Sequence, residues 1–319
     1  MKLGLFGAGL AAVFAASFAA AGAVGPVQSP STPTQSTAGP AKDDGAAQAA
    51  SAVTGLSMEE GGFILKDVSS PGSAGQQGTL SFTIADADGN PVTAFETSHD
   101  KKLHLIVVRT DGTQFRHVHP TMDDTGTWSL PWEWKTAGTY RVYADVVPTA
   151  TASNITLTRT VQAAGEFTPV QPAPVSTTDE VGGFDVALTG SLSASEETML
   201  KVTVTRDGQP VTTLQPYLGS YGHLVALREG DLAYLHVHPQ GREPQPGASS
   251  GPDVEFMTEA PTPGPYLLYL DFQVEGKVQT AEFVLNATGT SSATTAMPAD
   301  SAVPTDSAQP GKSADHSGH

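Results

Sequence analysis

Cysteine is absent from the 319-residue sequence. Its absence excludes disulfides, thiolate zinc sites, iron–sulfur clusters and cysteine nucleophiles. It also excludes a mononuclear blue-copper site, because that site requires a thiolate ligand. Any metal ion bound by this chain must therefore be held by imidazole, carboxylate or thioether groups.

Basic residues are also few, with 16 lysines and arginines against 33 acids and a net charge of −17. A surface this acidic repels nucleic acid and anionic lipid headgroups, and it mildly concentrates cations. We therefore expect no nucleic-acid partner. We expect contact with a membrane only through the amino-terminal segment.

Helical patterning is missing after Val24, where no stretch carries an apolar stripe of helical period. Instead, short apolar runs rich in Val, Ile, Thr, Tyr and Phe alternate with Gly, Asp and Pro. This pattern is typical of β-sandwiches. The sequence predicts an all-β protein with two tandem Ig-like or cupredoxin-like β-sandwich domains, disordered linkers and an N-terminal hydrophobic segment.

Composition divides the chain into six parts. The apolar run 3–24 predicts that residues 1–24 are a signal peptide or a transmembrane anchor. Residues 25–58, 165–179 and 288–319 are rich in small residues and proline, which predicts a disordered spacer, a linker and a disordered tail. The remaining chain is expected outside the cytoplasm, either anchored through residues 3–24 or secreted after cleavage.

The two remaining segments, 59–164 and 180–287, are copies of each other and are called repeat 1 and repeat 2. The sequence HLIVVRTDGTQFRHVHP (104–120) aligns without gaps to HLVALREGDLAYLHVHP (223–239), and YRVYAD (140–145) aligns to YLLYLD (266–271). Such an internal repeat predicts two domains of the same fold.

Six histidines follow one rule within these copies. Each copy has a histidine, twelve residues, a histidine, one residue, a histidine and a proline. The histidines are His104, His117 and His119 in repeat 1, and His223, His236 and His238 in repeat 2.

A hairpin would gather each of these trios. Asp111-Gly112 is a strong hairpin-turn signal and, as the centre of the turn, places His104 opposite His119. The side chains of His117 and His119 share a face, about 7 Å apart along the strand. Repeat 2 gives the same pairing of His223 with His238 if its loop is centred on Gly230-Asp231.

The other residues on this face are apolar. They are Ile106, Val108 and Phe115 in repeat 1, and Val225, Leu227 and Tyr234 in repeat 2. Imidazoles on an apolar face need hydrogen bonds or a metal ion, since a buried unsatisfied polar group costs about 1–3 kcal/mol. We therefore expect one copper or zinc site per repeat.

A fourth ligand is expected from Asp145 and Asp271, which occupy equivalent positions in an apolar strand. An acid there is costly unless it is paired or ligating, so the alternatives of metal ligand and structural tie stay open. Other histidines are expected to play smaller roles. His99 is expected at the surface, and His316 and His319 in the tail could scavenge metal.

The hairpins and the Tyr-x-x-Tyr-x-Asp strands resemble those of exported bacterial proteins with YtkA/FixH-like, heavy-metal-binding β-sandwich domains. The resemblance covers roughly 59–164 and 180–287. It implies metal handling outside the cell, with copper as the leading candidate and exchange of the ion with a partner protein.

Two other functions remain open. One is a structural or adhesive cell-surface protein whose histidines only tie strands together. The other is a cupin-like metalloenzyme, although neither His-x-His motif continues into the cupin pattern. Phosphate-cradling and His-Glu-x-x-His motifs are absent, so we expect a binding protein and no catalytic residues.

Overall fold

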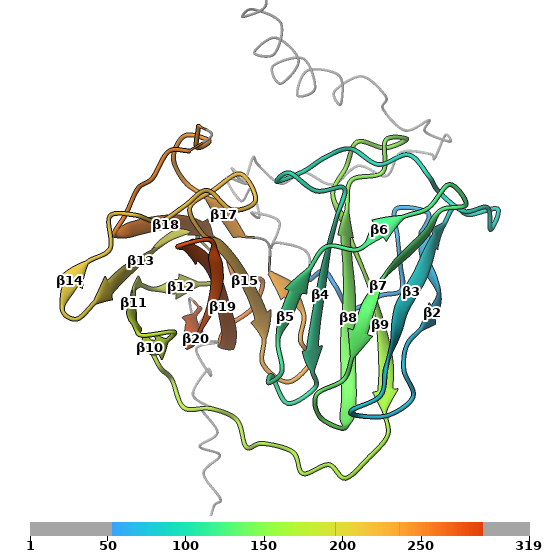
Figure 1. Cartoon of the computed structure of the whole chain (residues 1–319), viewed down its shortest axis with the longest axis horizontal. Helices are drawn as coiled ribbons and strands as arrows, with labels where there is room; N and C mark the ends of the chain where they lie inside the picture. The colour runs from blue at the N-terminus through green and yellow to red at the C-terminus, as the bar shows by residue number, and fades with distance from the viewer. Residues whose placement is uncertain (1–52, 195, 236, 246, 290–319) are drawn as a thin grey trace, which may run out of the picture. The chain divides into compact units, whose positions relative to one another are not determined.

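The computed structural model describes residues 53–194, 196–235, 237–245 and 247–289. All regular elements in these ranges are β-strands (Figure 1). The described residues contain no helix long and apolar enough to cross a membrane. The predicted signal or anchor segment (1–24), most of the spacer and most of the tail lie outside these ranges.

Repeat 1 is a sandwich of two sheets. The first sheet has the order β1-β2-β3-β7-β6, formed by β1 (Glu59–Glu60), β2 (Phe63–Ser69), β3 (Gln77–Ala85), β7 (Thr127–Glu133) and β6 (Thr121–Met122). The second has the order β5-β4-β8-β9, formed by β5 (Arg116–Val118), β4 (Leu103–Arg109), β8 (Gly138–Val146) and β9 (Ile155–Ala163). Trp128, Trp132 and Trp134 are buried in the core between the sheets, as expected of packing residues.

Repeat 2 has the same architecture. One sheet has the order β10-β11-β13-β18-β17, with β14 paired to β13; its strands are β10 (Thr178–Val181), β11 (Phe184–Gly190), β13 (Thr198–Arg206), β14 (Gln209–Pro210), β17 (Val237–Pro239) and β18 (Asp253–Thr258). The other has the order β12-β20-β19-β15-β16; its strands are β12 (Leu192–Ser193), β15 (His223–Arg228), β16 (Tyr234–Leu235), β19 (Gly264–Val274) and β20 (Lys277–Thr288). The predicted all-β fold with two tandem sandwiches is thus confirmed.

A third apolar cluster joins the two repeats. It consists almost entirely of equivalent positions, namely Ile106 and Val225, Val108 and Leu227, Tyr143 and Tyr269, and Phe115 and Tyr234, together with Leu232, Leu267 and Val284. Ile106 and Val108 lie on the outer face of β4, and Val225 and Leu227 on that of β15, because side chains alternate along a strand and the alternate residues fill the sandwich cores. The two histidine-bearing faces therefore bury each other.

Tyrosine hydrogen bonds cross this junction in both directions. Tyr143 donates to the Leu232 carbonyl at 2.6 Å, and Tyr269 donates to the Gly112 carbonyl at 2.5 Å. Equivalent tyrosines thus contact the hairpin turn of the opposite repeat, as in the self-complementary interface of a twofold dimer.

The ordered chain begins earlier than the predicted domain boundary. Thr54 forms a β-bridge with Tyr234, and the backbone NH of Thr158 donates to the carbonyl of Ser57 at 2.8 Å. Residues 53–58 therefore correct the prediction of a spacer disordered as far as residue 58. They are ordered because β16 offers unpaired edge groups.

Candidate metal centre

His104 lies in β4, in which every residue is buried. Its Nε2 is 3.0 Å from the Ser98 carbonyl oxygen. A carbonyl oxygen can only accept, so this nitrogen carries the ring proton and Nδ1 presents a lone pair. Burial and, secondarily, the nearby His117 lower the pKa of His104 to about 4, which keeps the ring neutral at pH 7.

His117 lies in β5 and is bound by a residue of the other repeat. Its Nδ1 is 3.0 Å from Asp271 Oδ2, and the two side chains are 0% and 4% exposed. Thr280 Oγ1 donates to the other carboxylate oxygen of Asp271 at 2.6 Å. The carboxylate fixes the ring with its proton on Nδ1, so that a neutral His117 presents the lone pair of Nε2.

One ring nitrogen from each of three histidines lies close to the others. His104 Nδ1 lies 3.0 Å from His117 Nε2 and 3.3 Å from His119 Nε2. Burial, followed by the nearness of His117 and His104, lowers the pKa of His119 to about 3. In the tautomers set by Ser98 and Asp271, neutral His104 and His117 direct the lone pairs of Nδ1 and Nε2 at each other across 3.0 Å, which is unfavourable unless a cation lies between them.

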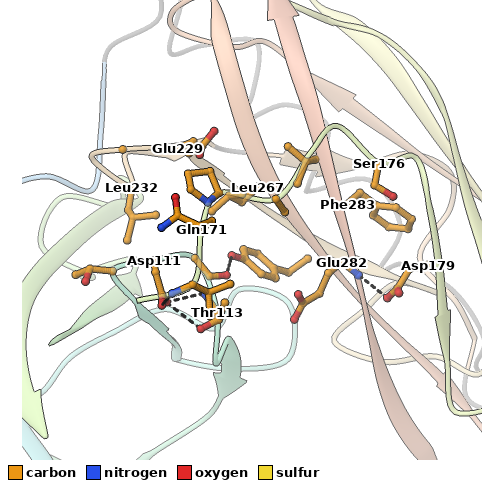
Figure 2. Close-up of a pocket in the computed structure, with 18 of the residues that line it drawn as sticks. Asp111, Thr113, Gln171, Ser176, Asp179, Glu229, Leu232, Leu267, Glu282 and Phe283 are labelled. Atoms are coloured by element: carbon orange, nitrogen blue, oxygen red, sulfur yellow. Dashed lines mark hydrogen bonds between the residues drawn. The ribbon is translucent and has the colours of Figure 1, made fainter. Parts of the chain in front are cut away.

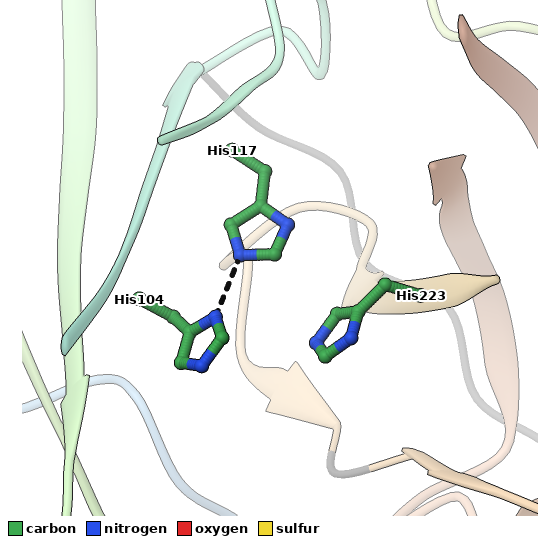
Figure 3. Close-up of side chains that lie close together, drawn as sticks. All are labelled: His104, His117 and His223. Atoms are coloured by element: carbon green, nitrogen blue, oxygen red, sulfur yellow. Dashed lines mark hydrogen bonds between the residues drawn. The ribbon is translucent and has the colours of Figure 1, made fainter. Parts of the chain in front are cut away.

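The fourth imidazole comes from repeat 2. His223 is the first residue of β15, and one ring nitrogen from each of His104, His117 and His223 lies within 4.8 Å of the others (Figure 3). The His223 ring stacks on His104 with 5.4 Å between the centroids and 7° between the planes. Its Nδ1 is buried with no hydrogen-bond partner among the described residues, and burial holds its pKa well below the usual value.

The first predicted trio is thus brought together, and its register is confirmed. Leu105 pairs with Val118 and Ile106 with His117, the alignment that places His104 opposite His119. The trio is completed by His223, which had been expected in a separate site.

The second predicted trio does not form among the described residues. In repeat 2 the hairpin pairing ends at Leu235, and the next strand, β17, pairs with β18 in the opposite sheet. His238 is exposed on that strand. His236 lies outside the described residues. The expectation of one site per repeat is corrected, because β15 and β17 belong to different sheets.

The two aspartates lie opposite the histidines of the neighbouring strands, His104 with Asp145 and His223 with Asp271. Asp271 binds His117 of the other repeat, a supporting contact that the sequence did not reveal. Asp145 accepts a hydrogen bond from Asn154 Nδ2 at 2.8 Å. Burial raises the pKa of Asp145 to about 7.

His99 lies closer to the cluster than expected. It is exposed, as predicted, but its ring packs edge-on against His223 with 5.2 Å between the centroids. This contact could not be predicted from the repeat, because repeat 2 has no histidine that corresponds to His99.

The cluster fits a transition-metal ion. Metal–imidazole bonds of about 2.0–2.1 Å in a tetrahedral site place the nitrogens about 3.3 Å apart, close to the observed 3.0 and 3.3 Å. The second ring nitrogens of His104 and His117 are bound by a carbonyl and a carboxylate. Such outer contacts fix the tautomers of metal-binding histidines.

A separate cavity of about 390 Å³ lies at the hairpin turns, lined in part by linker residues 170–173 (Figure 2). Asp111 accepts hydrogen bonds there from Thr113, and Asp179 accepts one from the backbone of Glu282. No histidine is among its described lining residues. It is therefore not part of the histidine cluster.

Comparisons with known proteins found similarity in solved structures but no match among curated proteins. The D0-D1 domain of intimin is 12% identical, with 71% of this chain and 97% of that chain covered and a TM-score of 0.20. Domains 5–6 of the S-layer protein SbsC are 13% identical over 72% and 99%, with a TM-score of 0.21. The fibronectin(III)-like modules of Clostridium thermocellum CbhA are 9% identical over 71% and 95%, with a TM-score of 0.19. Similarity at these scores transfers no function.

One family model matches both repeats, over residues 62–163 and 179–289. These two segments make up more than half of the chain. The family is described as a domain of unknown function, so the resemblance to YtkA/FixH-like modules stays a prediction. The chain belongs to the DUF8832 family.

Proposed function

We propose that this protein binds one copper or zinc ion at the junction of its two repeats. The ligands are His104 Nδ1, His117 Nε2, His119 Nε2 and a ring nitrogen of His223. The observation that carries the proposal is that His104 Nδ1 and His117 Nε2, which lack protons in the neutral tautomers set by Ser98 and Asp271, lie 3.0 Å apart, with His119 Nε2 3.3 Å from His104 Nδ1.

A proton is the main competitor for this position. If His117 were protonated, its Nε2 would donate to His104 and its charge would face Asp271, which is the structural role considered as the alternative. One proton, however, serves a single pair of nitrogens. The buried Nδ1 of His223 would then stay without a partner among the described residues, whereas a tetrahedral ion would be bound by all four rings.

Metal content tests the proposal. The full chain is prepared with His316→Ser and His319→Ser, so that scavenging by the tail does not count, and is equilibrated with Zn²⁺ or Cu²⁺. After desalting, we expect one ion per chain. His223→Gln should lose that ion, while the matched variant His238→Gln should keep it.

Two results would contradict the shared site. Two ions per chain, with one lost in His238→Gln, would restore one site per repeat. A melting temperature that neither metal nor chelator changes would leave the histidines with a structural role, because a ligand bound to the folded state stabilises it.

We further propose that the site works outside the cytoplasm as a binding site that exchanges its ion with a partner protein. The apolar run 3–24 supports this location. The complete burial of the His117 side chain supports storage or transfer of the ion over turnover of a substrate. Cell fractionation with an epitope-tagged chain tests the location, and a wholly cytoplasmic protein would contradict it.

A further inference from the structure

A cavity of about 200 Å³ borders the histidine cluster. Four of the described histidines line it, namely His99, His104, His223 and His238. Two of them, His104 and His223, belong to the proposed metal centre. The other two are exposed to solvent, so the cavity connects the buried centre with the surface through imidazoles.

The backbone around His99 fixes the position of its ring beside this cavity. It sits in a tight turn closed by two backbone hydrogen bonds between Ser98 and Lys101, at 2.8 and 3.0 Å. The His99 backbone has a φ of 47°, a left-handed conformation that few residue types adopt readily. The His99 ring at this turn packs edge-on against His223 and lies edge-on to His104, with 6.1 Å between the centroids of His99 and His104.

The charges around the cavity disfavour a free hydrated metal ion and favour an ion that is bound by imidazoles. Lys101 and Lys102 line the wall, and Asp145 provides the carboxylate. The two ammonium groups raise the cost of a free hydrated dication near the centre. Neutral imidazoles lower that cost by replacing water in the coordination shell, and His99 and His238 both line the cavity.

We propose that His99 and His238 form an outer capture site that passes a copper or zinc ion between solvent and the buried centre. The inference rests on the proposed metal function. It adds that two exposed histidines, neither of them a ligand of the final site, control how fast the ion enters and leaves.

The rates of metal exchange test this role. The double variant His99→Asn/His238→Gln removes both rings, and asparagine tolerates the left-handed backbone at position 99. Zn²⁺ uptake and its release to excess chelator are followed by stopped flow with the full chain. We expect uptake and release to slow together by about tenfold, which is about 1.4 kcal/mol in the barrier, with one ion still bound at unchanged affinity.

Glu96→Ala, an exposed position on the same loop, serves as the control and should keep wild-type rates. Unchanged rates in the double variant would overturn the capture site while leaving the metal centre intact. Loss of the ion from the double variant would instead place these rings in the primary site and also overturn the inference. A wild-type chain that binds no ion would refute the proposed function, and the capture site with it.

Discussion

At the scale of single residues, the account depends on which ring nitrogen carries a proton. Ser98 and Asp271 each accept from an outer nitrogen, of His104 and His117 respectively. They thereby direct the two inner nitrogens to the centre. A tautomer fixed by an outer contact is a common device of histidine metal sites.

Asp271→Asn should weaken metal binding by about 10–100-fold, the usual effect of removing an outer partner of a metal-binding histidine. The carboxylate holds His117, so the amide leaves the ring less basic and less ordered. Competition titration against a chelator measures the affinity. Asp145→Asn is the matched control and should change the affinity little, because Asp145 bonds Asn154. Equal losses in both variants would contradict this assignment.

The metal-free protein should lose stability as pH falls. His104 has a folded pKa of about 4 against an ordinary value of 6.5, so the unfolded chain takes up a proton first. The free energy of unfolding is therefore unaffected above about pH 6.5, falls between 6.5 and 4, and levels below. We expect a drop on the order of 2 kcal/mol from this ring, measured by urea unfolding between pH 7 and 4. His104→Gln should reduce the loss of stability by the share of this ring, while His119 and His223, whose pKa values are also lowered, keep the rest. An unchanged loss would contradict the burial of a neutral ring at position 104.

At the scale of elements, the β4–β5 hairpin shows what the sequence could predict. The turn at Asp111-Gly112 fixed the register, which is the one observed. The register predicted for the second hairpin is also observed, since Ala226 pairs with Leu235 and Leu227 with Tyr234. The sequence did not show, however, that after Leu235 the chain crosses to the other sheet. Whether a chain continues one hairpin or crosses depends on packing between sheets, which local sequence does not encode.

The turn of the first hairpin also packs against repeat 2. An added Cβ at Gly112 would lie 2.4 Å from Leu267 Cδ1, whereas at Gly230, in the corresponding turn of repeat 2, it would meet nothing within 4 Å. Both glycines have positive φ, 77° and 97°, so the backbone strain of alanine is similar at the two positions.

Gly112→Ala should therefore destabilise the protein by about 1–3 kcal/mol more than Gly230→Ala, the usual cost of overpacking. Urea unfolding of both variants measures the difference. Equal losses would show that the turn does not press on repeat 2.

At the scale of the whole molecule, the apolar face predicted on each hairpin is the surface that joins the repeats. The sequence placed Ile106, Val108, Val225 and Leu227 on the same strand faces as the histidines. It could not show that these faces bury each other, since the pattern of one strand does not name its partner. For the same reason Asp271 was assigned to its own repeat.

The crossed tyrosine bonds make a symmetric prediction for this junction. Tyr143→Phe and Tyr269→Phe should each lower the free energy of unfolding by about 1 kcal/mol, because each leaves a turn carbonyl of the other repeat without its donor. Thermal and urea unfolding measure both variants. A loss confined to one of them would contradict the equivalence of the two contacts.

The central claim is that both repeats supply ligands to one ion. Anomalous diffraction from crystals of the metal-loaded chain tests it most directly. The account predicts a single peak about 2.0–2.1 Å from His104 Nδ1, His117 Nε2 and a ring nitrogen of His223. Two peaks, one within each repeat, or a peak bound without His223 would contradict it.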